Sequence, residues 1–169
     1  MYDEILYPTD GSTGSEAAAA HVRELASAFD ATVRVLHVID TREGGLGVSG
    51  AFSDGESQAM SGRSPEEGYI GRHGDGPDPE EMDEELAEHA RELLEASAEP
   101  LGDADVTTAV KSGVPHSVIL QYADDNGVDL VVMGTHGRTG VERYLLGSVT
   151  EKVVRMSDVP VVTVRTDEE

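Results

Sequence analysis

Residues 133–150 read MGTHGRTGVERYLLGSVT, and this stretch decides the fold expected of the chain. It contains a G-x2-G-x9-G-S pattern formed by Gly134, Gly137, Gly147 and Ser148. The apolar run 128–133 comes directly before the pattern and predicts a buried strand, because a glycine bounds it at each end. We expect the helix after the loop to hold Ser148, Val149 and Thr150 in its first turn. The stretch therefore predicts a strand, a glycine-rich loop and a helix in succession.

A glycine-rich loop before a helix is suited to binding an anion. Glycine has no side chain, so backbone N–H groups can approach the anion, and the helix dipole favours its negative charge. The expected donors are the amides of Gly137, Gly147, Ser148 and Val149, with the hydroxyls of Ser148 and Thr150. We interpret the loop as a phosphate cradle, which favours a nucleotide as the ligand. The alternative is an ordinary tight connection that binds nothing.

With this pattern the chain resembles the universal stress protein family, in its ATP-binding branch. The resemblance rests on the glycine pattern together with ILYPTDGS at 5–12, VLHVID at 35–40, GVP at 113–115 and VPVVTV at 159–164. It implies an open parallel five-stranded sheet of order 3-2-1-4-5 with helices on both faces, as in adenine nucleotide alpha hydrolase-like proteins. Residues 41–79 do not take part in it.

Alternating strand and helix patterns independently predict one α/β domain, residues 1–169, with a parallel sheet. The predicted strands are 4–9, 32–39, 106–111, 128–133 and 159–164. The predicted helices are 13–29, 78–97, 115–126 and 144–157. Thr13 and Glu16 read as a capping box for the first helix. In the second helix Leu86, Leu93 and Leu94 are expected to face inward.

Residues 41–79 are rich in glycine and serine and poor in apolar residues, which predicts a flexible insertion. The insertion leaves the second strand at the edge of the sheet where we expect the ligand. It could therefore act as a lid, or be a solvated segment without a role.

The charge of the chain excludes several classes of partner. Asp and Glu number 34 against 12 Lys and Arg, for a net charge of −22. Such a field repels nucleic acid and anionic lipid. Lys111 and Lys152 are the only lysines, and an acidic, lysine-poor surface favours a salt-loving host, where salt screens the repulsion. With no cysteine, no leader and no run near the ~18 apolar residues of a membrane span, we expect a cytoplasmic protein.

A polyphosphate bound to so acidic a chain needs local positive charge. His136 and Arg138 lie inside the glycine loop and can supply it, and Mg²⁺ bound with ATP near Asp10 would neutralise more. Asp10 can instead be a turn residue before the first helix. His37 reads as a packed strand residue, and the other histidines outside the loop lack metal-ligand spacing.

The resemblance implies further nucleotide contacts at the ends of the strands. Pro8, Thr9 and Asp10 are implied to contact the nucleotide, and Val38 to meet adenine through its backbone. Met133 and Gly134 are implied to lie under the base and the ribose.

No catalytic residues are predicted, because the chain lacks a Walker loop, a kinase signature and a serine elbow. We expect an ATP-binding stress-response protein that acts as a nucleotide-dependent switch, with at most slow ATP hydrolysis. The alternatives are a protein-interaction module of the same fold and, less favoured, an ATP-using transferase or ligase. The strand between Val159 and Val164 is apolar enough to predict a homodimer through it. Other protein partners cannot be named from the residues.

Overall fold

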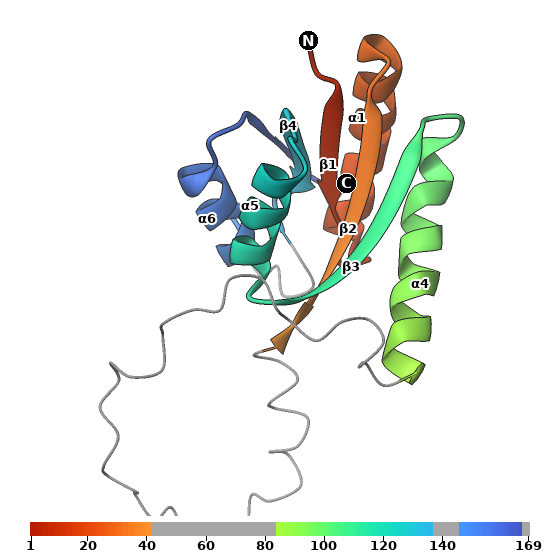
Figure 1. Ribbon diagram of the computed structural model, residues 1–169, viewed down its shortest axis with the longest axis vertical. Helices are drawn as coiled ribbons and strands as arrows, with labels where there is room; N and C mark the ends of the chain where they lie inside the picture. The colour runs from red at the N-terminus through yellow and green to blue at the C-terminus, as the bar shows by residue number, and fades with distance from the viewer. Residues whose placement is uncertain (42–83, 137–145, 167–169) are drawn as a thin grey trace, which may run out of the picture.

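The computed structural model describes residues 1–41, 84–136 and 146–166. Five parallel strands form one sheet in the order β3-β2-β1-β4-β5, which confirms the predicted order and fold class (Figure 1). The strands are β1 (Glu4–Pro8), β2 (Thr32–Asp40), β3 (Val106–Gly113), β4 (Leu130–Gly134) and β5 (Val161–Val164).

Helices cover both faces of the sheet. They are α1 (Thr13–Phe29), α4 (Glu84–Ala98), α5 (Pro115–Asp125) and α6 (Ser148–Met156), with a 3-10 turn, η2 (Glu99–Leu101), after α4. In Figure 1, α1 and α4 lie on one side of the strands, and α5 and α6 lie on the other. None of the helices in the described ranges is both long and apolar enough to cross a membrane.

Each face of the sheet has its own apolar core, because side chains alternate along a strand. In β1, Ile5 and Tyr7 pack toward α1 and α4. Leu6, between them, packs against the α5 and α6 face with Ile119 and Val153. All three β1 side chains are fully buried, so the strand is held from both sides.

The chain leaves the two central strands in opposite directions. β1 and β4 are paired neighbours, at Ile5↔Leu130 and Leu6↔Val131. After β1 the chain passes to α1 on one face, and after β4 it passes to α6 on the other. In open α/β sheets ligands bind outside the carboxyl ends of the strands at such a reversal of strand order, so this edge is the candidate site.

The capping box expected at Thr13 and Glu16 is wrong. Ser12 is the N-cap of α1, and its Oγ accepts a hydrogen bond from the Ser15 amide at 3.3 Å. Ser12 has extended backbone angles, φ −78° and ψ 158°, as an N-cap requires, whereas Thr13 is already the first helical residue. The expected extent of this helix is confirmed.

One of the three leucines expected to face inward from α4 does not. Leu86 is 42% exposed, while Leu94 is buried and Leu93 is partly buried. The buried residues of α4 begin only at Ala90, so Leu86 lies in the first turn, before the helix reaches the core.

Two strands begin two residues later than predicted. The Val128 amide donates to the carbonyl of Ala123, so Val128 closes the end of α5 and β4 starts at Leu130. The Val159 amide donates to Ser157 Oγ, so this residue belongs to the turn before β5. The helix starts expected at 78 and 144, and the insertion from 42 to 79, lie outside the described residues; α6 is described from Ser148.

Candidate functional site

The carboxyl ends of β1 and β4 bring together most of the residues predicted to bind a nucleotide. Pro8 ends β1 and is followed by Thr9 and Asp10, while Met133 and Gly134 end the neighbouring β4. Hydrogen bonds also join the start of α6 to the end of β4 and the residue after it. Gly137 and Arg138 lie outside the described residues.

The first turn of α6 carries amides that the helix itself does not use. Its first intrahelical bond runs from the Glu151 amide to the Gly147 carbonyl, at 2.9 Å. The amides of Ser148, Val149 and Thr150 precede that bond and have no intrahelical acceptor. No side chain caps them within the described part of the chain, in contrast to α1, which Ser12 caps. Among the described residues these amides thus have no acceptor from a capping side chain, and their bonding to an anion stays a prediction for Ser148 and Val149.

Two other donors predicted for the ligand are used by the fold instead. The Gly147 amide donates to the Thr135 carbonyl at 2.7 Å. The Thr150 side chain is 3% exposed, and its Oγ1 donates to the Gly134 carbonyl at 2.9 Å. The prediction that these two groups face an anion is wrong, because the carbonyls at the end of β4 are buried and need donors of their own. Nothing in the sequence pattern distinguishes a donor used in this way from an open one.

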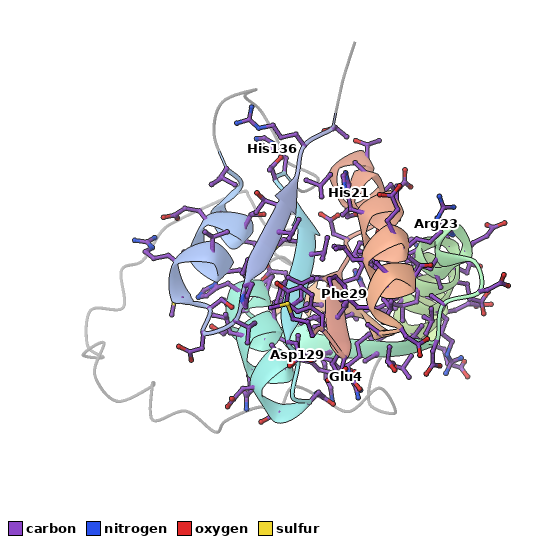
Figure 2. The ribbon with its side chains drawn as sticks, turned by 90° about the horizontal axis from the view of Figure 1, so that it is seen from above. Glu4, His21, Arg23, Phe29, Asp129 and His136 are labelled. Carbon is purple, nitrogen blue, oxygen red and sulfur yellow. The ribbon has the colours of Figure 1, made fainter. Side chains whose placement is uncertain are left out.

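His136 lies two residues after the end of β4, and one of its ring nitrogens has no partner among the described residues. Its Nδ1 lies 3.0 Å from Thr135 Oγ1, while its Nε2 is buried and makes no hydrogen bond with the part of the chain that the structure describes. Its carbonyl packs against Gly14, in the first turn of α1. Figure 2 shows His136 beyond the ends of the strands, near the start of α1. A buried polar atom without a partner is uncommon in folded proteins and is a natural place for a ligand to bond.

Asp10 is a turn residue before α1, which is one of the two roles expected for it from the sequence. Its Oδ1 accepts two hydrogen bonds from Ser12, one from the amide at 3.0 Å and one from Oγ at 2.5 Å. These bonds hold the carboxylate at the start of α1, next to the end of β1. Its contact with a nucleotide or with hydrated Mg²⁺ stays a prediction.

Thr9 is a structural centre of this edge, which the sequence did not indicate. It is 5% exposed, its amide donates to the Leu36 carbonyl at 2.9 Å, and its carbonyl lies 2.9 Å from His37 Nδ1. Its Oγ1 bonds to Ser15 and Ser97. Any contact of Thr9 with a ligand therefore has to share groups that already bond within the protein.

β2 extends beyond the end of β1 and brings Val38 to the same edge. Pro8, the last residue of β1, pairs with Leu36, so Val38 lies past that end. The Val38 side chain packs against the core on the α5 and α6 face. His37 is 8% exposed and packs in the strand, as expected.

The ionisable group deepest under the site is not suited to proton transfer. Tyr7 is fully buried, and its hydroxyl donates to the Ser15 carbonyl at 2.8 Å. Burial raises its pKa from the ordinary 10.0 to about 12, so the phenol stays neutral at physiological pH. Within the described ranges no three His, Cys, Asp or Glu side chains gather where they could hold a metal ion.

The sequence profile of the universal stress protein family matches residues 1–165. The chain belongs to this family. Universal stress protein MJ0577 of Methanocaldococcus jannaschii is 36% identical over 167 residues, covering 98% of this chain and 96% of that protein.

Solved structures agree with the fold. The structure of MJ0577 superposes with a TM-score of 0.73 at 32% identity, over 100% of this chain and 99% of that one. A universal stress protein solved in complex with cAMP superposes with a TM-score of 0.60 over 98% of each chain. Its identity is 21%, so this second likeness concerns the fold alone.

Proposed function

We propose that this protein binds an adenine nucleotide, ATP with Mg²⁺, at the carboxyl edge of its sheet and acts as a nucleotide-dependent switch in the stress response. The observation that carries the proposal is the open start of α6. The amides of Ser148 and Val149 have no capping side chain in the described part of the chain, and the unpartnered Nε2 of His136 follows the adjoining strand. Amides at a helix start and an imidazole together suit a phosphate group.

Family relatives support an adenine nucleotide as the ligand. One member of the fold was solved with cAMP and another, 16% identical, with dAMP. The rest of the nucleotide would lie along the ends of β1, β2 and β4, where Asp10, Val38 and Met133 are placed. This position agrees with the crevice of other open α/β sheets.

We include Mg²⁺ in the proposal because the chain has a net charge of −22. A polyphosphate brought to so acidic a chain is repelled unless its charge is neutralised close by. Mg²⁺ bound with the phosphates would do this, with the Asp10 carboxylate contacting its water shell. We infer a cytoplasm of high ionic strength as the setting, because salt screens the remaining repulsion.

Substitutions at Ser148 test the open amide directly. Ser148→Pro removes both amide and hydroxyl, and proline is tolerated here because Ser148 is the first helical residue and Gly147 before it is extended at ψ 152°. Ser148→Ala removes the hydroxyl alone. In calorimetric titrations of Mg-ATP in concentrated KCl, we expect Ser148→Pro to weaken binding about ten-fold or more, since a bond to a charged acceptor is lost.

Ser148→Ala should weaken binding less than the proline variant does, which separates the amide from the hydroxyl. Equal affinity of wild type and Ser148→Pro, with both folded, would contradict a phosphate at this helix start. The same titration without Mg²⁺ measures how much the cation contributes to the affinity for ATP.

We also propose that the protein is a homodimer through the strand between Val159 and Val164. β5 is an edge of the sheet, and among the described strands it pairs with β4 alone. Val161 and Val162 are only half-buried. An apolar edge strand left uncovered favours aggregation, and pairing with its symmetry mate satisfies its backbone.

A protein-interaction module is the second candidate, and a separate observation favours it. Leu146, Val154 and Met156, on or next to α6, are 44%, 45% and 56% exposed. Exposed large apolar side chains are candidates for contact with a protein partner. A folded wild type that binds no adenine nucleotide at any salt concentration would favour this function over the switch.

A further inference from the structure

Beneath the turn that follows β1 lies a cluster of buried hydroxyl groups from three elements. Thr9 follows β1, Ser15 lies in the first turn of α1, and Ser97 lies near the end of α4; each is 5% exposed. Thr9 Oγ1 is 3.1 Å from both Ser15 Oγ and Ser97 Oγ. α4 is far from β1 in the sequence, so this contact is purely tertiary.

Counting protons fixes the direction of these bonds. Ser15 Oγ lies 2.8 Å from the Ser12 carbonyl, which can only accept, so Ser15 donates its single proton there. Ser15 must then accept from Thr9, which uses the single proton of Thr9. Ser97 must therefore donate to Thr9. The hydroxyls form a one-way chain from α4 to the N-cap of α1.

The Thr9 hydroxyl makes three hydrogen bonds in this arrangement. It donates to Ser15 and accepts from Ser97, and its second lone pair accepts the Gly11 amide at 3.2 Å. Because hydrogen bonds in a chain polarise one another, the donor at its start strengthens those that follow. Loss of Ser97 would leave a buried lone pair of Thr9 without a partner and would weaken its hold on Gly11.

The turn held in this way carries Asp10. The Ser12 carbonyl accepts the last hydrogen bond of the hydroxyl chain, from Ser15 Oγ. The amide and the hydroxyl of Ser12 both donate to Asp10 Oδ1. α4 also packs on the turn through Leu93, whose Cδ1 would be 3.1 Å from a Cβ placed on Gly11. Gly11 has φ +71°, so this tight turn favours glycine on both counts.

We propose that Ser97 is a positioning residue: it orients the Thr9 hydroxyl and so holds the turn that presents Asp10 to the nucleotide. Its connection to binding rests on the proposed function. Its connection to the turn does not, because the hydroxyl chain is made only of groups of the protein itself. α4 thereby contributes to the site through contacts with the turn after β1, although it is far from β1 in the sequence.

The first test measures amide hydrogen exchange in the ligand-free protein. Ser97→Ala should speed exchange of the Gly11 amide by about five-fold relative to the Ala31 amide, which bonds to the Ala26 carbonyl at the far end of α1. Val33→Ala is the control, because Val33 is a fully buried core residue at the amino end of β2. A merely destabilising change speeds both amides through global unfolding. An unchanged Gly11-to-Ala31 ratio in Ser97→Ala would overturn the inference.

The second test measures AMP affinity by calorimetry in the same variants. Ser97→Ala should raise the dissociation constant by about five-fold, and Val33→Ala by less than about two-fold, when both are measured well below their unfolding temperatures. Equal effects of the two variants would show that Ser97 acts on stability alone. A wild type that binds no adenine nucleotide would remove the proposed function, while the exchange ratio would still decide whether Ser97 positions the turn.

Discussion

Gly134, the last residue of β4, lies against the backbone of Gly14 in the first turn of α1. A Cβ on Gly134 would overlap the carbonyl group of Gly14, and a Cβ on Gly14 would overlap the carbonyl oxygen of His136. The two glycines thus allow α1 to start directly over the end of β4. The first glycine of the loop pattern is required by helix packing, whether or not an anion lies nearby.

We predict that Gly134→Ala destabilises the fold, because its methyl group meets rigid backbone and not a flexible side chain. Overpacking of this kind costs about 1–3 kcal/mol, to be measured as the free energy of unfolding in denaturant. Gly102→Ala is the matched control. Gly102 has φ +62° with open space around it, so that variant reports backbone strain without a clash. A Gly134→Ala protein as stable as wild type would mean that α1 shifts to accept the methyl group.

Thr150→Val should also destabilise the fold. Valine keeps the shape of threonine but leaves the Gly134 carbonyl without the donor that now lies 2.9 Å away. An unsatisfied buried acceptor costs about 1–3 kcal/mol in unfolding free energy. Thr150→Ser keeps the hydroxyl and should lose less. If both variants lose equally, the methyl group and not the hydrogen bond holds α6 to β4.

We predict that the buried Tyr7 makes the protein less stable in alkaline solution. Burial raises its folded-state pKa from 10.0 to about 12, so between these pH values the unfolded chain ionises while the folded protein keeps its proton. The contribution of Tyr7 to the free energy of unfolding is fully present below pH 10 and falls by about 1.4 kcal/mol per pH unit up to pH 12. Unfolding free energies measured across this range should show the slope.

Tyr7→Phe is the control for that slope. It removes the hydroxyl that donates to Ser15, so the protein should be less stable at neutral pH but should lose less stability from pH 10 to 12. An identical pH dependence in the two proteins would assign the alkaline transition to other groups.

Val162→Asp should convert the proposed dimer into a monomer. Val162 lies in the middle of β5, and a carboxylate there would face its own copy across the symmetry axis at high cost. Size-exclusion chromatography with light scattering measures the mass. Ser27→Asp, on the exposed face of α1, adds the same charge away from β5 and should not change the mass. A Val162→Asp protein that stays dimeric would count against this interface.

Local sequence signals were sufficient for most of the fold. The extent of α1 and the start of α5 at Pro115 follow from caps, apolar spacing and proline, all of which act over a few residues. Even here the sequence does not distinguish Thr13 from Ser12 as the cap, because adjacent hydroxyl residues offer the same chemistry and only their backbone angles differ.

The candidate site was predictable as a place but not in its bonding. The glycine pattern placed Gly147, Ser148 and Thr150 together at a helix start, as the structure has them. It did not show that the Gly147 amide and the Thr150 hydroxyl are taken by β4. Which buried carbonyl needs a donor depends on which elements meet, and that is a tertiary property.

The sequence by itself thus determined the family, the order of strands and helices, and the edge of the sheet at which α6 begins. These features are encoded by side-chain period, turn residues and a glycine spacing, which are local in the chain. Only the tertiary structure decided that Gly134 allows α1 to pack closely on β4. It also decided that Thr9 is the centre of a hydroxyl chain and that Ser97 of α4 is the first donor in it. Those roles exist only when residues distant in sequence are packed so closely that each buried donor must find an acceptor.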